Sequence, residues 1–591
     1  MILCKRNVCL MLVLVWTVSC EDTDRQVVTV DTNVGTINGY VKETTYLGET
    51  YKIDRFQGIP YAEAPVGERR FMKALPKAPF TAPFDAFAHG SMCMQPKYGE
   101  YYFKGYDFNY SEDCLHLNIY APHMRNKDDK LPVMVWIYGG AFIFGFSDSY
   151  LGDNIVASGN VIVVTFNYRV SLWGFLNTGN DVAPGNAGLW DQHMAIKWVN
   201  DNIGTFGGDT ERVTIFGESA GSASVIYQAL YPGNKGLFQR VIGQSGSVEC
   251  QWASQEDVPK YTKVLASLTD CENDDSQVMV ACLQKVSNDH LLDLVTNDSN
   301  GFVVFPVPFS PSRDDDFVKY DPLSAFSELP SAAIDMFQSV DLILGINSAE
   351  GGAAISPEFG IEDAENFLPS RTEYQDLIKQ LLDMGYTNNS RSELIHELVT
   401  AEYTNWNEPD DPLKIREEFV ALHSDIWYLA PLYNTADKHS EGLHSKTFMC
   451  ILDFVPSTPF VTNVTWLKGL SHGEDLPLTF GYKSDNAEDD GRAVEWEKML
   501  SKDIITLWTN FAKTGNPNKP VNLGLDWLPY TEKHQHYLHI TRDMTSLNVK
   551  QRWNTRRANF WSKIISKIAN SAEVTEKHDE ETCEKDGGCF P

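Results

Sequence analysis

The chain has 591 residues, of which 43% are hydrophobic and 22% are charged, and its formal net charge is −31 at pH 7. This composition supports a large folded core and excludes an intrinsically disordered chain. A surface this acidic repels the phosphates of nucleic acids and of anionic lipids, so we expect no nucleic-acid partner.

The first twenty residues have the features of a secretory signal peptide. Lys5 and Arg6 precede an apolar stretch over residues 8–18, and small residues lead to Cys20 before an acidic run. The apolar stretch is too short to cross a bilayer, so a membrane anchor is the weaker alternative. We therefore predict a signal peptide over residues 1–20, a secreted, extracellular protein, and no stable membrane anchor.

Secretion makes the cysteines and some asparagines informative. Of the eleven cysteines, three lie in the predicted signal peptide and eight follow it, none with the spacing of a zinc site. We expect neither a metal nor a cofactor, and the oligomeric state is left open. Four Asn-x-Ser/Thr motifs are candidate glycosylation sites, namely Asn109, Asn297, Asn388 and Asn463.

The strands and helices predicted in chain order indicate an α/β fold. Residues 28–51 alternate and turn like a small antiparallel sheet, whereas the strands after residue 130 are almost continuously apolar. Such strands are typical of a parallel sheet covered by helices on both faces. We predict one catalytic domain over residues 21–562 and a polar tail over 563–591. The predicted later strands cover 131–140, 160–169, 212–216, 240–246, 341–348 and 446–455, with helices over 188–203 and 220–230 and mainly helical structure over 365–440.

A Gly-x-Ser-x-Gly pattern stands where one of these strands gives way to a helix. In "RVTIFGESAGSASV" (212–225) the central serine is Ser219, between Gly217 and Gly221. The pattern alone is compatible with an ordinary tight turn. At a strand-to-helix junction it also suits the sharp turn that holds a serine nucleophile above a sheet, with the positive helix N-terminus beneath it.

A serine hydrolase also needs a base, an acid and donors for the oxyanion. Gly140 and Ala141, in "WIYGGAF" after a strand, and Ala220, directly after the serine, are the candidate amide donors. His472, in the Gly/Ser-rich loop "GLSHGEDLPLTFG", has the best context for the base. Glu350 follows the strand "LILGINS", but with eighty acidic residues in the chain, chemistry alone does not select it as the acid.

Several longer stretches, taken together, resemble one known family. They include "FQGIPYAEAPVGERRF" (56–71), "SEDCLHLNIYAP" (111–122), "PGNAGLWDQHMAIKWVNDNIGTFGGD" (184–209), "TIFGESAGSASV" (214–225) and "SHGEDLPLTFG" (471–481). These stretches occur in the same order along the chain as in the type-B carboxylesterases and cholinesterases. The chain is therefore similar to this family, whose members are α/β-hydrolases.

The resemblance implies roles for individual residues. It implies a catalytic triad of Ser219, Glu350 and His472, with oxyanion donors at Gly140, Ala141 and Ala220. It also implies disulfides Cys93–Cys114 and Cys271–Cys282 and a buried ion pair between Arg70 and Glu112. It gives no partner for Cys250 or Cys450, and the pairing of Cys583 and Cys589 is left open.

The expected activity is the hydrolysis of uncharged carboxylic or lipid esters through an acyl-enzyme. A cholinesterase is the alternative, although the loop between Cys93 and Cys114 has five tyrosines and two phenylalanines but no tryptophan to bind a quaternary ammonium. A less favoured alternative is an inactive adhesion domain similar to neuroligins, which lack the serine that this chain has at position 219. The natural ester and the acyl-chain preference are left open.

Overall fold

The structure is a computed structural model that describes residues 25–569 with internal gaps. The gaps are residues 98–99, 101–105, 124–128, 298–299, 301, 303–306, 357–359, 387–390, 460–463 and 483–493. The predicted signal peptide, Asn388, Asn463, Cys583 and Cys589 lie outside the described residues.

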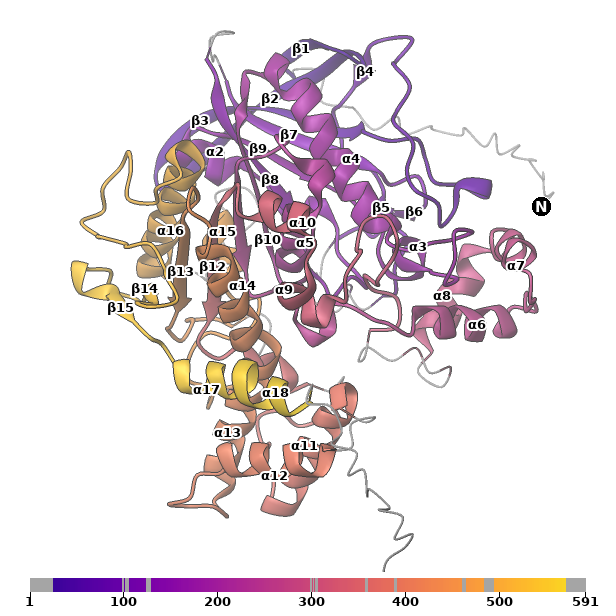
Figure 1. Cartoon of the computed structure of the whole chain (residues 1–591). Coiled ribbons are helices and arrows are strands. Elements are labelled where there is room, and N and C mark those ends of the chain that lie inside the picture. Colours follow the sequence, from indigo (N-terminus) through magenta and orange to yellow (C-terminus); the bar gives the residue numbers. More distant parts are fainter. Residues whose placement is uncertain are drawn as a thin grey trace, which may run out of the picture.

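A 13-stranded sheet forms the centre of the molecule, with the order β1-β2-β3-β7-β9-β8-β10-β11-β12-β13-β14-β15 and β4 beside β2 (Figure 1). The first strands are β1 (Val27–Thr32), β2 (Gly35–Tyr46), β3 (Glu49–Pro60), β4 (Phe84–Asp85) and β7 (His116–Pro122). The later strands are β8 (Leu131–Ile137), β9 (Ile162–Phe166), β10 (Gly208–Glu218), β11 (Arg240–Gln244), β12 (Asp341–Asn347), β13 (Thr447–Leu452), β14 (His536–Ile540) and β15 (Val549–Gln551).

The middle of this sheet is parallel and its two ends are antiparallel. Neighbours from β9 through β8, β10, β11, β12 and β13 to β14 all run parallel. Strands β1, β2 and β3 pair antiparallel, as expected for residues 28–51, but they are continuous with the central sheet because β3 also pairs with β7. A separate two-stranded sheet holds β5 (Met92–Cys93) and β6 (Tyr110–Ser111).

Helices cover both faces of the parallel strands, which explains why those strands are apolar throughout. Strand β9 is buried at every residue. On β10, Gly217 faces α5 (Ala220–Leu230), while the ring of its neighbour Phe216 stacks on Phe480 of α15 (Leu476–Phe480). Since successive strand residues point to opposite faces, α5 and α15 lie on opposite sides of the sheet.

The remaining helices surround this core or extend from it (Figure 1). Around the sheet lie α2 (Asp153–Gly159), α3 (Ser171–Phe175), α4 (Ala187–Asn202), α9 (Ala325–Glu328), α10 (Ser331–Phe337), α14 (Ala430–Ser440) and α16 (Glu495–Thr514). Two groups extend outward: α6 (Val258–Leu268), α7 (Ser276–Leu283) and α8 (Asn288–Thr296), and α11 (Arg371–Tyr386), α12 (Ser392–Glu402) and α13 (Pro412–Ser424).

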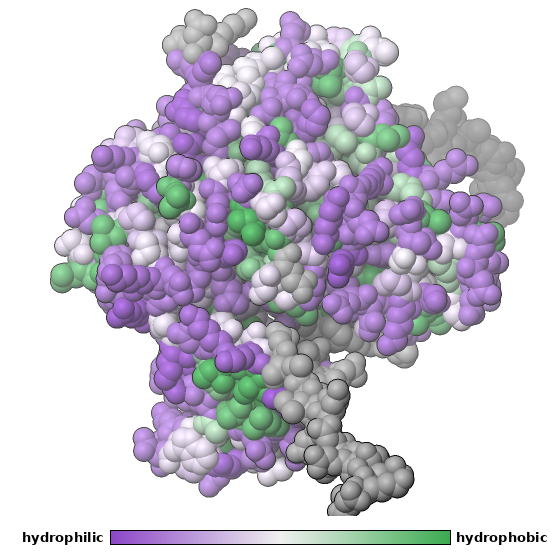
Figure 2. All heavy atoms as spheres, in the orientation of Figure 1, coloured by the Kyte–Doolittle hydropathy of each residue, from purple (hydrophilic) through white to green (hydrophobic). Residues whose placement is uncertain are grey.

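The described chain ends in helix beside the second of these groups. Helix α17 (Thr555–Asn559), a π-helical turn η12 (Phe560–Ile565) and α18 (Ser566–Ala569) follow one another there (Figure 1). Residues 563–569 of the predicted polar tail are therefore helical. None of the described helices is long and apolar enough to cross a membrane, and Figure 2 shows one face of the molecule covered mainly by hydrophilic residues.

Candidate active site

The turn between β10 and α5 holds Ser219 in an unusual backbone conformation. Its φ is +57° and its ψ is −123°, a region that non-glycine residues adopt only when their surroundings hold them there. The flanking glycines are required by close packing: a Cβ on Gly217 would lie 2.5 Å from the backbone of Gly221, and one on Gly221 would lie 2.0 Å from the carbonyl oxygen of Ile137. The sequence therefore produces a sharp turn that presents the serine hydroxyl at the edge of the sheet.

Three side chains that are far apart in the sequence meet at this edge. The Nε2 atom of His472 lies 2.8 Å from the hydroxyl of Ser219, and its Nδ1 lies 2.7 Å from Oε2 of Glu350. Glu350 begins the 3-10 turn η8 (Glu350–Ala354) after β12, and His472 lies between β13 and α15. All three thus follow carboxyl ends of parallel strands, where α/β sheets place their binding sites.

The second carboxylate oxygen of Glu350 is also fixed. Oε1 accepts a hydrogen bond from the backbone N–H of Asn347, at 2.7 Å, and another from the hydroxyl of Ser245. Ser245 follows β11 and has a φ of +58°. The Glu350 side chain is fully buried, and these two contacts hold it so that its other oxygen faces His472. Sequence reasoning did not identify Ser245, because its role depends on two strands that meet only in the fold.

The predicted oxyanion loop runs directly past Ser219. A Cβ on Gly139 would lie 2.9 Å from the Cβ of Ser219, and one on Gly140 would lie 2.1 Å from the carbonyl oxygen of Phe144. Gly140 and Ala141 both have positive φ, of +100° and +54°. The loop is therefore tightly folded beside the serine, and Ala220, the residue after the serine, begins α5.

A second carboxylate that sequence reasoning missed lies at the same histidine. Oε1 of Glu218 is 3.5 Å from Nε2 of His472, and the Glu218 side chain is buried. Burial raises the pKa of Glu218 to about 8. Burial on its own lowers the pKa of His472, but the carboxylates of Glu218 and Glu350 outweigh it and raise that pKa to about 9.

Asp475 adds a further buried acid three residues after His472. Its carboxylate accepts hydrogen bonds from Gln244 Nε2 at 2.5 Å and from Asn347 Nδ2 at 3.1 Å. Burial raises the pKa of Asp475, and the nearby charge of Glu350 adds to that effect. Three buried acids, Glu218, Glu350 and Asp475, therefore lie close to the imidazole of His472.

The cysteines and the predicted ion pair are arranged as the resemblance implies. Disulfides join Cys93 to Cys114 and Cys271 to Cys282, while Cys250 and Cys450 are free and buried. Arg70 binds Glu112 through two hydrogen bonds of 2.6 Å, from Nε and from NH2. Both side chains are about nine-tenths buried, so the pair holds the loop of the first disulfide against the body of the domain.

The described aromatic residues of that loop pack against one another. The rings of Tyr106 and Phe108 lie 5.2 and 5.9 Å from the ring of Phe146, and Phe108 stacks on Tyr110. Of the candidate glycosylation sites, Asn109 and Asn297 are both exposed.

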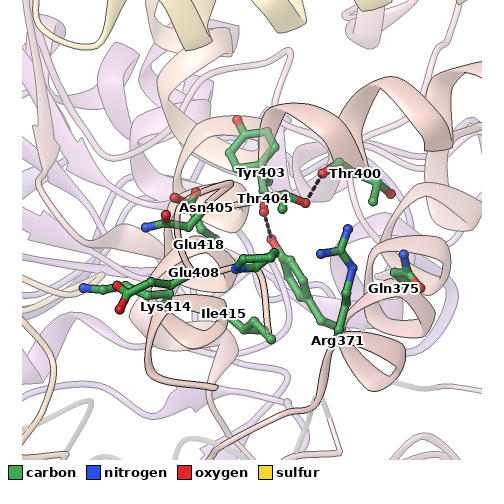
Figure 3. Close-up of a pocket in the computed structure, with 12 residues that line it drawn as sticks. Arg371, Gln375, Thr400, Tyr403, Thr404, Asn405, Glu408, Lys414, Ile415 and Glu418 are labelled. Atoms are coloured by element: carbon green, nitrogen blue, oxygen red, sulfur yellow. Dashed lines mark hydrogen bonds between the residues drawn. The ribbon is translucent and has the colours of Figure 1, made fainter. Parts of the chain in front are cut away.

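A pocket elsewhere on the molecule contains none of these groups. It lies among α11, α12 and α13 and is lined by residues that include Arg371, Tyr403 and Glu418 (Figure 3). Its volume is about 10 Å³, which is roughly the space that a single water molecule requires. This pocket therefore offers no room for an organic substrate.

A family model described as the carboxylesterase family matches residues 26–561. The chain belongs to the carboxylesterase family. It is thus a carboxylic ester hydrolase with the α/β-hydrolase fold.

The relatives include proteins named bile salt-activated lipase and proteins named neuroligin. The chain is 36% identical to the bile salt-activated lipase of Bos taurus, over 91% of this chain and 87% of that protein. It is 34% identical to the human bile salt-activated lipase, over 90% of this chain and 68% of that protein. It is also 30% identical to neuroligin-2 of Mus musculus, over 92% of this chain and 68% of that protein.

Proposed function

We propose that this protein hydrolyses uncharged carboxylic or lipid esters with Ser219 as nucleophile, His472 as general base and Glu350 as the acid that orients the histidine. The amides of Gly140, Ala141 and Ala220 bind the oxyanion. The observation that carries the proposal is the continuous chain of contacts from the Ser219 hydroxyl through His472 to Glu350, with distances of 2.8 and 2.7 Å.

The reaction follows from these positions. The Ser219 Oγ attacks the ester carbonyl carbon while its proton moves to Nε2 of His472, and the amides stabilise the negative oxygen. The ester's C–O bond then breaks, and the alcohol leaves with the proton from His472, so that the acyl group remains on Ser219. A water molecule then attacks the acyl group in the same way, which releases the carboxylic acid and restores the serine.

The preference for uncharged esters rests on the composition of the first disulfide loop. A quaternary ammonium is bound best over an indole ring, and residues 94–113 contain no tryptophan. Tyr106 and Phe108, two of the aromatic residues in this loop, face Phe146 and each other. The relatives named bile salt-activated lipases support a lipid ester as one substrate class.

We also propose that the protein is secreted after cleavage of residues 1–20, with a catalytic domain over 21–562. Two disulfides and two exposed Asn-x-Ser/Thr asparagines support an oxidising, extracellular environment. The partner of the site is then a small-molecule or lipid ester, with no nucleic acid and no stable membrane anchor.

A hydrolysis panel tests the proposed substrate class. The catalytic efficiencies for acetylthiocholine and for an uncharged thioester of similar size are compared at equal ionic strength, beside long triacylglycerols with and without bile salt. We expect the uncharged thioester to be the better substrate. A preference of more than about tenfold for the cation, the size of a good cation–π contact, favours the cholinesterase alternative. No hydrolysis of any ester favours the neuroligin-like alternative.

A further inference from the structure

The two nitrogens of His472 contact Ser219, Glu218 and Glu350, but the face of its ring is held by another residue. The ring of Tyr428 lies 4.7 Å from the imidazole, centroid to centroid, at an angle of 35° between the planes. Aromatic rings whose centroids lie about 4.5–7 Å apart make favourable contacts. Tyr428 is 5% exposed and the His472 side chain 16%, so the contact is largely shielded from water.

Tyr428 belongs to an irregular turn of helix. Residues Asp425–Leu429 form a π-helical turn, η10, between α13 and α14, and all five of its residues are buried. Such turns are rare, interrupt the regular spacing of side chains, and are frequent at functional sites. Within this turn the ring of Tyr428 faces His472, whereas the neighbouring Trp427 packs edge-on against His423.

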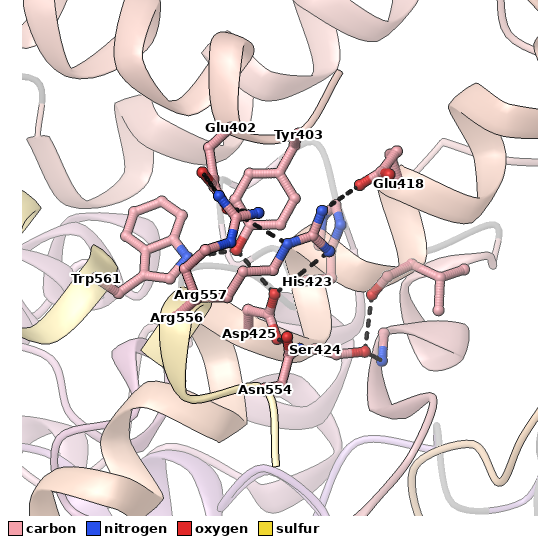
Figure 4. Close-up of polar contacts among 12 residues, drawn as sticks. Glu402, Tyr403, Glu418, His423, Ser424, Asp425, Asn554, Arg556, Arg557 and Trp561 are labelled. Atoms are coloured by element: carbon pink, nitrogen blue, oxygen red, sulfur yellow. Dashed lines mark hydrogen bonds and ion pairs between the residues drawn. The ribbon is translucent and has the colours of Figure 1, made fainter. Parts of the chain in front are cut away.

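The first residue of η10 is tied to the C-terminal helices (Figure 4). The hydroxyl of Tyr403 donates to Asp425 at 2.9 Å and accepts from Nε1 of Trp561 at 2.7 Å. Asn554 donates to the other oxygen of Asp425 at 3.2 Å, and a guanidinium nitrogen of Arg557 lies 3.8 Å from the carboxylate. These contacts fix the position of η10 through its first residue, Asp425.

The same helical run also supports the acid. The backbone N–H of Gly351, next to Glu350, donates to the hydroxyl of Ser424 at 2.8 Å, and Ser424 directly precedes η10 (Figure 4). A Cβ on Gly351 would lie 2.2 Å from the carbonyl oxygen of Val420 on α13. One packed segment therefore contacts the loop that carries Glu350 and the ring of the histidine that Glu350 binds.

We infer that Tyr428 is a positioning residue that holds the imidazole of His472 in line between Glu350 and Ser219. The inference rests on the proposed triad and adds a part to it that acts through the ring face rather than through a proton. The charged and titratable groups facing His472 are Glu218, from β10, and Glu350, from η8, with Asp475 close by at the start of α15. These groups act on the nitrogens at the edge of the ring, whereas the Tyr428 ring packs against its face and adds a restraint on rotation of the imidazole.

The test compares variants that keep or remove the Tyr428 ring. Tyr428→Phe keeps the ring, Tyr428→Leu and Tyr428→Met remove it, and Trp427→Leu is the matched control that removes a neighbouring ring from the same turn. The readouts are kcat and KM with p-nitrophenyl acetate and the low-field proton resonance of the hydrogen bond between His472 Nδ1 and Glu350. That resonance reports the position of the histidine without turnover.

We expect Tyr428→Leu and Tyr428→Met to lower kcat about tenfold, the equivalent of one good aromatic contact, with little change in KM. Their low-field resonance should broaden or disappear. Tyr428→Phe should stay within about twofold of the original kcat, because the contact is between rings, and Trp427→Leu should keep a sharp resonance. The Met variant preserves the test if the Leu variant does not fold.

Two results overturn the inference. In one, the variants without the ring retain both kcat and the sharp resonance. In the other, Tyr428→Phe loses as much as Tyr428→Leu, which assigns the effect to the hydroxyl. A failure of the triad itself is seen separately, as full activity in Ser219→Ala.

Discussion

The turn that carries Ser219 and the loop that carries His472 are built in different ways. The residues that form the Ser219 turn are contiguous in sequence: Gly217 and Gly221 flank the serine, and β10 and α5 adjoin it, although Ile137 on β8 is what requires the glycine at position 221. The His472 loop is held by distant contacts, from Glu350, Glu218 and Tyr428. The proposed nucleophile thus lies in one short motif, whereas the proposed base is positioned only by the tertiary fold.

The largest loss of ester hydrolysis is expected from a substitution in the Ser219 turn. Ser219→Ala removes the nucleophilic oxygen and little packing, so the protein should fold normally while ester hydrolysis falls about 10⁴-fold or more. The measurement is kcat/KM on purified protein, with circular dichroism as the control for folding. Near-normal turnover by a folded variant rules out Ser219 as the nucleophile.

Glu350→Gln tests the contact that holds His472 from a distant part of the sequence. The amide still hydrogen bonds to His472 but lacks the charge that stabilises the histidinium, so kcat should fall about 10³- to 10⁴-fold. KM should change much less. If Gln is tolerated at this position while substitution of Asp475 abolishes turnover, the acid is wrongly assigned.

The glycines of the turn should matter for stability as well as for catalysis. In Gly221→Ala the new Cβ would lie 2.0 Å from the carbonyl oxygen of Ile137, and backbone cannot move aside as a flexible side chain does. We expect a loss of about 3 kcal/mol in the free energy of unfolding, measured by urea denaturation. Gly204→Ala, where a Cβ would meet nothing within 4 Å, is the control, and equal effects at the two positions refute the packing argument.

Glu218→Gln should change the pH dependence of turnover. His472 must be neutral to accept the serine proton, and the charge of Glu218 raises the pKa of His472. Removing that charge lowers this pKa, so the acid limb of the kcat/KM profile should move to lower pH by about one unit. Glu211→Gln, an exposed position on the same strand, controls for net charge. An unchanged profile means that Glu218 does not control the protonation of His472.

Elements that are contiguous in sequence could be predicted, whereas contacts between distant residues could not. The helix over 220–230 and the strand leading to Ser219 were predicted, because an apolar strand followed by a run of small and helix-compatible residues can be recognised within one short stretch of sequence. The strand itself is longer, Gly208–Glu218. Ser245, Glu218 and Tyr428 were not identified, because serine, glutamate and tyrosine are common residues. Their contacts with Glu350 and His472 arise only when β11, β10 and η10 come together.

The choice of Glu350 among eighty acidic residues shows the same limit. Its position after a strand reduced the number of candidate acids, and the family resemblance then selected Glu350. The structure gives the physical reason for its suitability: its carboxylate is buried, held by Asn347 and Ser245, and aimed at Nδ1 of His472.

The most direct test of the central claim is covalent labelling followed by peptide mapping. The purified protein is treated with a fluorophosphonate, which reacts with a serine only where a neighbouring base activates it, and the labelled peptide is sequenced by mass spectrometry. Our account predicts a single label on Ser219, lost in Ser219→Ala and strongly slowed in Glu350→Gln. A folded, ester-hydrolysing protein that is labelled at another residue, or at none, would contradict it.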